Sequence, residues 1–190
     1  MLALRTPTAA DWLRVVLADL DAFLVDHAAC ERKASATGMA FVVRYPDRRE
    51  LLEPLIAFAR EELEHFQRVY RIIEARGLVL AGDTKDDYVG ALRSHCRPRG
   101  DEHLLDRLLT AGIVEARGCE RFSLLAEGLP AGELQDFYRD ITRSESRHHA
   151  LFVQLARHYF TEETVRARLD QLLDAEAAIV ADLPVRPAVH

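Results

Sequence analysis

The sequence has few of the features that mark secreted, membrane-spanning or disulfide-stabilised proteins. Its 190 residues include only three cysteines, Cys30, Cys96 and Cys119, which form neither a CxxC pair nor an even-numbered disulfide framework. No apolar run approaches the ~20 residues that a transmembrane helix requires, and the first residues lack a signal-peptide pattern. These absences predict a reduced, cytoplasmic protein that has no membrane contact.

Charge and composition exclude little else. The net charge of −6 argues mildly against a nucleic-acid partner. A chain of 190 residues, 49% of them hydrophobic, is long enough to bury one core. We therefore expect residues 1–190 to form a single domain.

Two short motifs stand out, each a glutamate followed three residues later by a histidine. The first motif is Glu62 with His65, and the second is Glu145 with His148. Residues three apart share one face of a helix, so each motif can hold a metal ion with both side chains. One such motif would carry little weight, but the surroundings of the two are alike.

A lone glutamate precedes each motif at almost the same distance. Glu31 and Glu115 lie 31 and 30 residues before the glutamates of the two motifs. The midpoints of these intervals fall at strong turn signals, residues 46–47 and 128–132. Each half therefore predicts an antiparallel helical hairpin with a glutamate on one arm and Glu-x-x-His opposite. Two such hairpins supply the four glutamates and two histidines of ferritin-like di-iron and di-manganese proteins.

The predicted fold class is all-α: a ferritin-like four-helix bundle with a long crossover between helices 2 and 3 and an extra C-terminal helix. We expect bundle helices at residues 8–44, after Asp47 to about residue 76, at 101–127 and from Pro130 onward. A short helix is expected at 86–94 within the crossover, and the extra helix at 162–180. Residues 184–190 should be frayed.

Neighbouring residues compete for two of the ligand positions. Glu61, four residues before His65, is the alternative to Glu62, and His149 is the alternative to His148. We prefer Glu62 and His148 because only they give the same spacing in both halves.

Other residues near the lone glutamates allow two interpretations. His27, one turn before Glu31, either supports that ligand or is simply a packed histidine. Gly112 and Gly118, beside Glu115, permit either a close helix crossing or room for dioxygen and a substrate. Arg93, Arg97 and Arg99 in the crossover could bind phosphates or lie in an ordinary exposed loop.

The ligand types indicate the chemistry. Carboxylate-rich sites with one imidazole per metal suit iron or manganese better than zinc. Two ferrous ions could bind dioxygen and generate an oxidant that attacks a C–H bond. Because the sequence has no GxGxxG, flavin motif or CxxC iron site, we expect the electrons to come from a separate reductase or ferredoxin-type protein.

Four segments resemble the MiaE family of bacterial tRNA hydroxylases, and the resemblance covers nearly the whole chain. These segments are residues 26–34 (DHAACERKA), 61–66 (EELEHF), 113–122 (IVEARGCERF) and 137–148 (FYRDITRSESRH). By position, the family's iron ligands match six residues of this chain: Glu31, Glu62, His65, Glu115, Glu145 and His148.

The resemblance implies a non-haem di-iron monooxygenase. Its reaction would be the oxygen-dependent hydroxylation of the isopentenyl side chain of methylthio-isopentenyl adenosine, next to the tRNA anticodon. The anticodon stem-loop would then be bound by arginines of the crossover and of the first turn: Arg93, Arg97, Arg99, Arg44, Arg48 and Arg49. The alternative is a ferritin-like iron-binding protein or peroxidase without a tRNA substrate, although the missing CxxC module argues against a rubrerythrin-type peroxidase. A non-enzymatic bundle is the least favoured, since six aligned donors are costly to bury without a cation.

Overall fold

The computed structural model describes residues 2–82 and 85–190, and this part of the chain contains seven α-helices and no strand. The all-α class predicted from the sequence is therefore confirmed. Backbone contacts divide the chain into two compact units. One comprises residues 14–84 and 186–189, and the other comprises residues 1–13, 85–185 and 190. The expectation of one domain over residues 1–190 stays a prediction.

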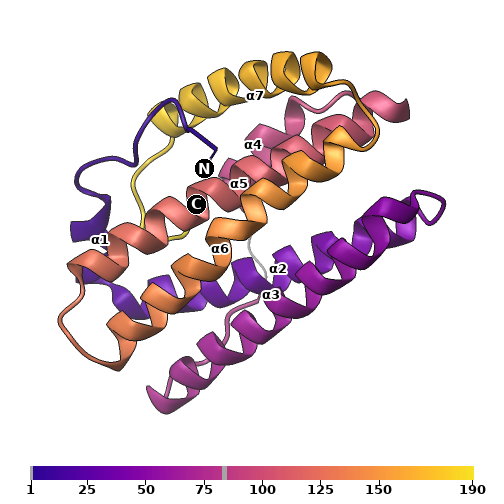
Figure 1. Ribbon diagram of the computed structural model, residues 1–190. Coiled ribbons are helices and arrows are strands. Elements are labelled where there is room, and N and C mark those ends of the chain that lie inside the picture. Colours follow the sequence, from indigo (N-terminus) through magenta and orange to yellow (C-terminus); the bar gives the residue numbers. More distant parts are fainter. Residues whose placement is uncertain (1, 83–84) are drawn as a thin grey trace. The chain divides into compact units, whose positions relative to one another are not determined.

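The first unit is built on an antiparallel hairpin of α2 (Leu20–Arg44) and α3 (Arg49–Ala75) (Figure 1). The two helices approach closely at Gly38, where an added Cβ would lie 2.9 Å from Cδ1 of Phe58. Ser35 lies one turn earlier and donates a hydrogen bond of 2.7 Å from Oγ to the carbonyl oxygen of Ala59. The missing side chain at Gly38 and the small one at Ser35 thus permit the short helix separation that brings the facing residues of the hairpin together.

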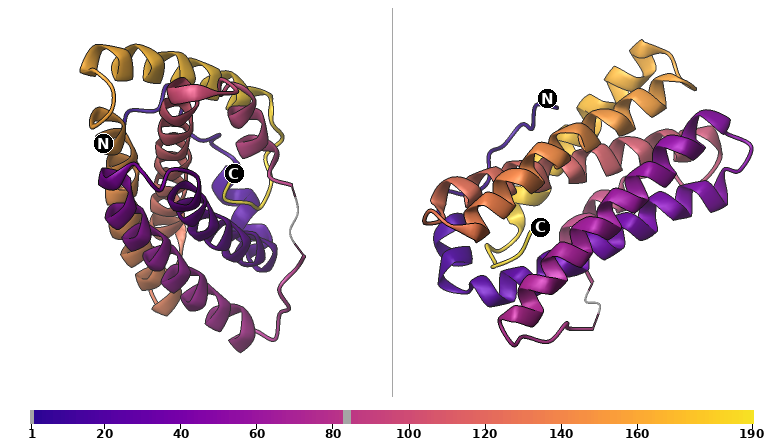
Figure 2. Two further views of the ribbon diagram at one scale, coloured as in Figure 1. Left: turned by 90° about the vertical axis from the view of Figure 1, so that its right-hand side faces the viewer. Right: turned by 60° about the horizontal axis from the view of Figure 1, so that its bottom comes forward.

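The second unit contains a matching hairpin of α5 (Gly100–Gly128) and α6 (Glu133–Arg157) (Figure 2). A Cβ at Gly112 would lie 3.2 Å from the backbone oxygen of His149 and 3.3 Å from Cβ of Phe152. A close helix crossing therefore accounts for Gly112. The C-terminal helix α7 (Glu162–Asp182) packs against α5, α6 and the short helix α4 (Asp87–Ser94). Helix α4 confirms the helix expected within the crossover, of which residues 83 and 84 lie outside the described residues.

Three helix starts differ from the prediction. The first helix is broken into α1 (Trp12–Ala18) and α2, because Asp19 leaves the helical conformation and accepts a hydrogen bond of 3.1 Å from the backbone N–H of Ala22. Helix α3 starts after Arg48, one residue later than expected. Helix α6 starts after Gly132 and not at Pro130. The φ of 156° at Gly132 is not a helical angle, so Pro130 lies before the helix.

The expectation of a frayed C-terminus was wrong. The backbone N–H of Val189 donates a hydrogen bond of 2.7 Å to the carboxylate of Asp26. The ring of His190 stacks on Tyr88 with 5.1 Å between the ring centroids. Specific polar and aromatic contacts hold this tail, and the local composition from which we predicted fraying does not reveal them.

A buried ionic network holds α7 to α5. Arg117 and Glu176 are both fully buried, with 2.8 Å between Nη2 and Oε1. Arg117 also binds Glu120 and, over 3.2 Å, the hydroxyl of Thr8. Tyr88 on α4 donates a 3.0 Å hydrogen bond to Glu176. Burial and the charge of Glu176 raise the pKa of Tyr88 well above its usual value, so this hydroxyl stays protonated as a donor.

We expect the Glu176→Ala variant to lose about 3–5 kcal/mol of unfolding free energy, because Arg117 would keep a buried, uncompensated charge. Urea unfolding followed by circular dichroism measures this change. The matched control is Glu163→Ala, which removes an exposed carboxylate from the first turn of the same helix and should cost less than about 1 kcal/mol. A loss in Glu176→Ala as small as the loss expected for Glu163→Ala would show that the buried pair contributes little.

Candidate metal centre

The α2–α3 hairpin brings three of the predicted ligands together. Glu31 comes from α2, and Glu62 and His65 come from α3. Nδ1 of His65 lies 3.7 Å from Oε2 of Glu31 and 3.9 Å from Oε2 of Glu62. One donor atom from each of the three side chains lies within 4.8 Å of the others. We call Glu31, Glu62 and His65 the first triad.

Burial separates the competing carboxylates on α3. Glu62 is 1% exposed and lies on the same helix face as the buried residues Phe58 and Val69. Glu61 is half-buried and Glu64 is exposed. The apolar face of the helix thus carries Glu62 inward, which supports the choice of Glu62 over Glu61.

His27 is bonded to the first triad without belonging to it. Its Nε2 lies 2.5 Å from Oε1 of Glu31, one helical turn away, and the two side chains are 0% and 4% exposed. Burial alone would raise the pKa of Glu31, but the charge of His27 and hydrogen bonds from His27 and His65 outweigh it and hold the pKa well below the usual value. Glu31 is therefore an ionised carboxylate, the form that binds a metal.

The α5–α6 hairpin supplies a second triad, Glu115, Glu145 and His148. Nδ1 of His148 lies 3.0 Å from Oε2 of Glu145, and donor atoms of the three side chains lie within 4.8 Å of one another. His149 is also buried, but it is not part of this group, and neither ring nitrogen has a hydrogen-bond partner in the described residues. The geometry thus favours His148 over His149.

Cys119 lies close to the second triad but is poorly suited to be a ligand. Burial and the nearby carboxylates of Glu145 and Glu115 raise the pKa of its thiol to about 11. Only a thiolate binds a metal well, and this thiol is protonated at neutral pH.

Each triad offers two carboxylates and one imidazole, and the side chains are buried except for the half-buried Glu115. Buried carboxylates are costly unless a positive charge accompanies them. Oxygen donors with one imidazole suit iron or manganese. The buried glutamates and histidines therefore fit a di-iron site.

The arginines predicted to contact a substrate differ in their surroundings. Arg97 donates hydrogen bonds of 2.7–2.9 Å to Asp106, which is fully buried and also binds Arg168. Arg93 and Arg99 are exposed. At the first turn, Arg44 and Arg49 are exposed and Arg48 is half-buried.

The sequence reasoning missed Asp106, which fixes the crossover loop through Arg97. A signal was present, because Asp106 lies between Leu105 and Leu108 on an otherwise apolar helix face. A charged residue at such a position indicates a buried partner of opposite charge.

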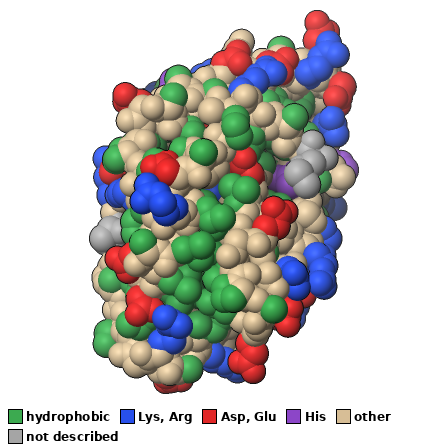
Figure 3. Space-filling view, turned by 90° about the vertical axis from the view of Figure 1, so that its left-hand side faces the viewer, with side chains coloured by type: hydrophobic (Ala, Val, Ile, Leu, Met, Phe, Trp, Pro, Cys, Tyr) green, Lys and Arg blue, Asp and Glu red, His purple; other side chains and the backbone are tan. Residues whose placement is uncertain are grey.

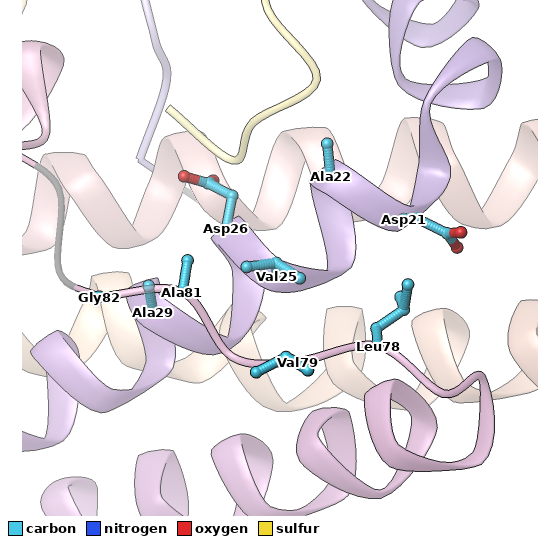
Figure 4. Close-up of a pocket in the computed structure, with 9 residues that line it drawn as sticks. All are labelled: Asp21, Ala22, Val25, Asp26, Ala29, Leu78, Val79, Ala81 and Gly82. Atoms are coloured by element: carbon cyan, nitrogen blue, oxygen red, sulfur yellow. The ribbon is translucent and has the colours of Figure 1, made fainter.

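A groove of about 360 Å³ lies between α2 and residues 78–82 (Figure 4). Its lining combines aliphatic side chains such as Val25 and Leu78 with Asp21 and Asp26. Asp21 pairs with Arg76 at 2.6 Å, and the side chain of Asp26 points away from residues 78–82, toward its bond with Val189. No triad residue lines this groove, so it is not the metal site.

Known proteins resemble the chain over most of its length. A family model described as tRNA-(MS[2]IO[6]A)-hydroxylase (MiaE) matches residues 1–190. A tRNA 2-(methylsulfanyl)-N(6)-isopentenyladenosine(37) hydroxylase of Pseudomonas putida is 33% identical over 177 residues, covering 93% of this chain and 86% of that protein. The protein of the same name from Salmonella typhimurium is 32% identical over 132 residues, covering 70% of this chain and 48% of that protein.

A solved structure is also similar. It is described as protein 43 with aldehyde deformylating oxygenase activity, from Synechococcus, and it is 37% identical with a TM-score of 0.92. The likeness covers 97% of this chain and 92% of that chain. It confirms the ferritin-like fold class predicted from the two hairpins.

The structure predicts different effects at adjacent glutamates of α3. We expect Glu62→Ala to bind ferrous iron at least about 10-fold more weakly than the wild type, because even an indirect partner of a ligand contributes 10- to 100-fold to affinity. Glu61→Ala, which removes the half-buried neighbour, should bind iron as the wild type does. Anaerobic iron titration followed by metal analysis measures both. If iron binding is weakened only in Glu61→Ala, Glu61 is the ligand and Glu62 is not.

Proposed function

Because the chain belongs to the MiaE family of tRNA hydroxylases, we propose that it hydroxylates the isopentenyl side chain of methylthio-isopentenyl adenosine next to the tRNA anticodon. The observation that carries this proposal is the family match over residues 1–190. The two triads support it because a di-iron monooxygenase requires a carboxylate-rich site that can hold two metal ions.

The proposed active centre combines the two triads around two iron ions. The side chains that hold the metals, and through them take part in catalysis, are Glu31, Glu62, His65, Glu115, Glu145 and His148. When bound, the iron pair would provide the binding site for dioxygen and would pass to it electrons that an external donor must replace in each turnover. This combination rests on the equal composition of the triads and on the ferritin-like pattern.

The protein's own residues prepare this centre. Glu31 is kept ionised, as its depressed pKa indicates. Cys119 is kept as a neutral thiol by its raised pKa, so it does not compete for metal. Buried apolar side chains such as Phe58 on α3 and Phe152 on α6 exclude water from the neighbourhood of the ligands.

Electrons must come from outside the chain. We assign this role to a separate reductase or ferredoxin-type protein, because the sequence offers no flavin, nicotinamide or iron–sulfur motif. None of the helices in the described part of the chain is both long and apolar enough to cross a bilayer. A cytoplasmic location follows from the proposed tRNA substrate.

A second candidate function is aldehyde deformylation. It is favoured by one observation, the 37% identity to the Synechococcus protein described as having aldehyde deformylating oxygenase activity. Both reactions would use the same metals, so the substrate distinguishes them. An iron-binding protein without either substrate remains the alternative if neither reaction occurs.

We place the tRNA contacts at arginines of the crossover and the first turn, of which Arg48 and Arg97 are half-buried and the others exposed. Arg93 and Arg99 are free to bind phosphates, whereas Arg97 holds the loop through Asp106. Arg44, Arg48 and Arg49 form the second cluster. On the face shown in Figure 3, basic and acidic side chains are interspersed, without a single large basic patch. In this proposal, the two arginine clusters carry the phosphate contacts.

Nucleoside analysis of total tRNA tests the proposed reaction. A host that makes methylthio-isopentenyl adenosine should accumulate the hydroxylated nucleoside when it expresses the wild-type chain. With Glu115→Ala, hydroxylation should fall by at least about 100-fold, because one ligand of the metal centre is lost. Unchanged hydroxylation by this variant would contradict the site assignment. If the wild type leaves tRNA unmodified but converts an aldehyde, the second candidate function holds.

Charge reversal tests the tRNA contacts. The double variant Arg93→Glu/Arg99→Glu should bind tRNA more weakly, and the slope of log affinity against log salt should fall by about 1 per lost phosphate contact. Its iron content should equal that of the wild type. Arg166→Glu is the control, since Arg166 is exposed on α7 outside both clusters. Equal tRNA affinity in both variants would remove Arg93 and Arg99 from the interface.

A further inference from the structure

Helix α3 carries an exposed aromatic side chain close to the turns that hold the proposed ligands. Among the aromatic side chains that the structure describes, only Tyr70 is exposed, with 38% of its surface accessible. It lies five residues after His65, which is about 7.5 Å along the helix axis. His65 is on the buried side of α3, whereas Tyr70 is on the solvent side. The helix that supplies Glu62 and His65 to the first triad thus presents one aromatic ring to solvent.

Neighbouring side chains restrain the ring of Tyr70. It stacks on the half-buried ring of Phe66, one turn earlier, with 6.3 Å between the centroids and 27° between the ring planes. The guanidinium carbon of Arg32, on α2, lies 5.9 Å from the centroid of the Phe66 ring. A contact across the hairpin therefore holds Phe66, and Phe66 in turn holds Tyr70. A restrained ring loses little side-chain entropy when another flat group stacks on it.

The charges on the solvent side of α3 are mixed. Arg60 and Arg71 are exposed, and neither has an ion pair within the described residues. Glu64 and Glu74 are exposed on the same helix. Such a surface can contact single phosphates, but it lacks the dense positive charge that holds a duplex by its backbone. Stacking on Tyr70 would then supply much of the affinity of this surface for RNA.

We propose that Tyr70 is a stacking platform for an unpaired base of the anticodon loop, and that Arg71 contacts the phosphate of the same nucleotide. This inference rests on the proposed tRNA substrate. Proteins recognise single-stranded RNA loops by stacking the bases on aromatic side chains, because an unpaired base exposes a flat face. A base held at Tyr70 fixes the loop while the neighbouring modified adenosine is hydroxylated.

The small apolar area favours a base over a protein partner. In the described part of α3, the exposed large apolar side chains are Leu63 and Tyr70, and the exposed Glu64 directly follows Leu63. The exposed Met39 and Val43 of α2 lie toward the turn at the other end of the hairpin. A stable protein interface buries about 800 Å² on each partner. One ring beside one leucine matches a single nucleotide better.

Binding of the full-length, iron-loaded protein to a labelled anticodon stem-loop RNA, followed by fluorescence anisotropy, tests this inference. Tyr70→Leu removes the ring but keeps an apolar side chain and a good helix former. It should bind the stem-loop at least about 5-fold more weakly, the lower end of what one stacked base contributes. The slope of log affinity against log salt should stay unchanged, because no phosphate contact is lost. Tyr70→Phe, which keeps the ring, should bind as the wild type does.

Two controls separate stacking from other effects. Val79→Ala removes an apolar side chain that is 83% exposed outside α3, and it should bind the stem-loop as the wild type does. An RNA duplex without a loop should bind equally to the wild type and to Tyr70→Leu.

Wild-type affinity of Tyr70→Leu for the stem-loop would overturn the stacking platform, and so would an equal loss of affinity for the duplex. Loss of self-association in Tyr70→Leu, with unchanged stem-loop affinity, would overturn it in favour of a contact between copies of the chain. If the wild type binds neither RNA, the proposed tRNA substrate is contradicted, and this inference with it.

Discussion

Each hairpin carries two glutamates and a histidine on its apolar face, and a buried carboxylate costs several kcal/mol unless a positive charge accompanies it. Glu62 and Glu145 are 1% and 2% exposed. The depressed pKa of Glu31 shows one part of the compensation, since His27 and His65 stabilise its ionised form. The buried glutamates and histidines fit a di-iron site, whose cations would complete the compensation. In this proposal, the two hairpins are organised around ligands for metal.

The hairpins reach this arrangement through close helix contact. Gly38 and Gly112 remove a side chain where α2 meets α3 and where α5 meets α6. A helical glycine costs about 1 kcal/mol relative to alanine, so both positions give up helix propensity for a shorter helix separation. Away from the ligands, the Arg117–Glu176 pair and the Asp106 cluster hold α7 and the crossover loop with buried charges of their own. Rigid surroundings of this kind keep ligand geometry reproducible.

Sequence spacing predicted the hairpins well because the metal ligands, the turns and the apolar faces all follow the same helical period. The break at Asp19 was not predictable in this way, since neither glycine nor proline marks it. Long-range contacts were equally hidden: the bond of Arg97 to Asp106 depends on how the loop meets α5. The anchored tail at Val189 and His190 belongs to the same class. Local patterns encode elements, whereas pairing across the fold requires the structure.

The most direct test of this account is the source of the oxygen atom in the product. Reduced, iron-loaded protein would be mixed with tRNA that carries methylthio-isopentenyl adenosine, under isotopically labelled dioxygen in ordinary water. Mass spectrometry of the digested nucleosides should then show the heavy oxygen in the new hydroxyl group. A hydroxylated product without the label would contradict a di-iron monooxygenase reaction. No product at all, from protein shown to hold two irons, would contradict the proposed substrate.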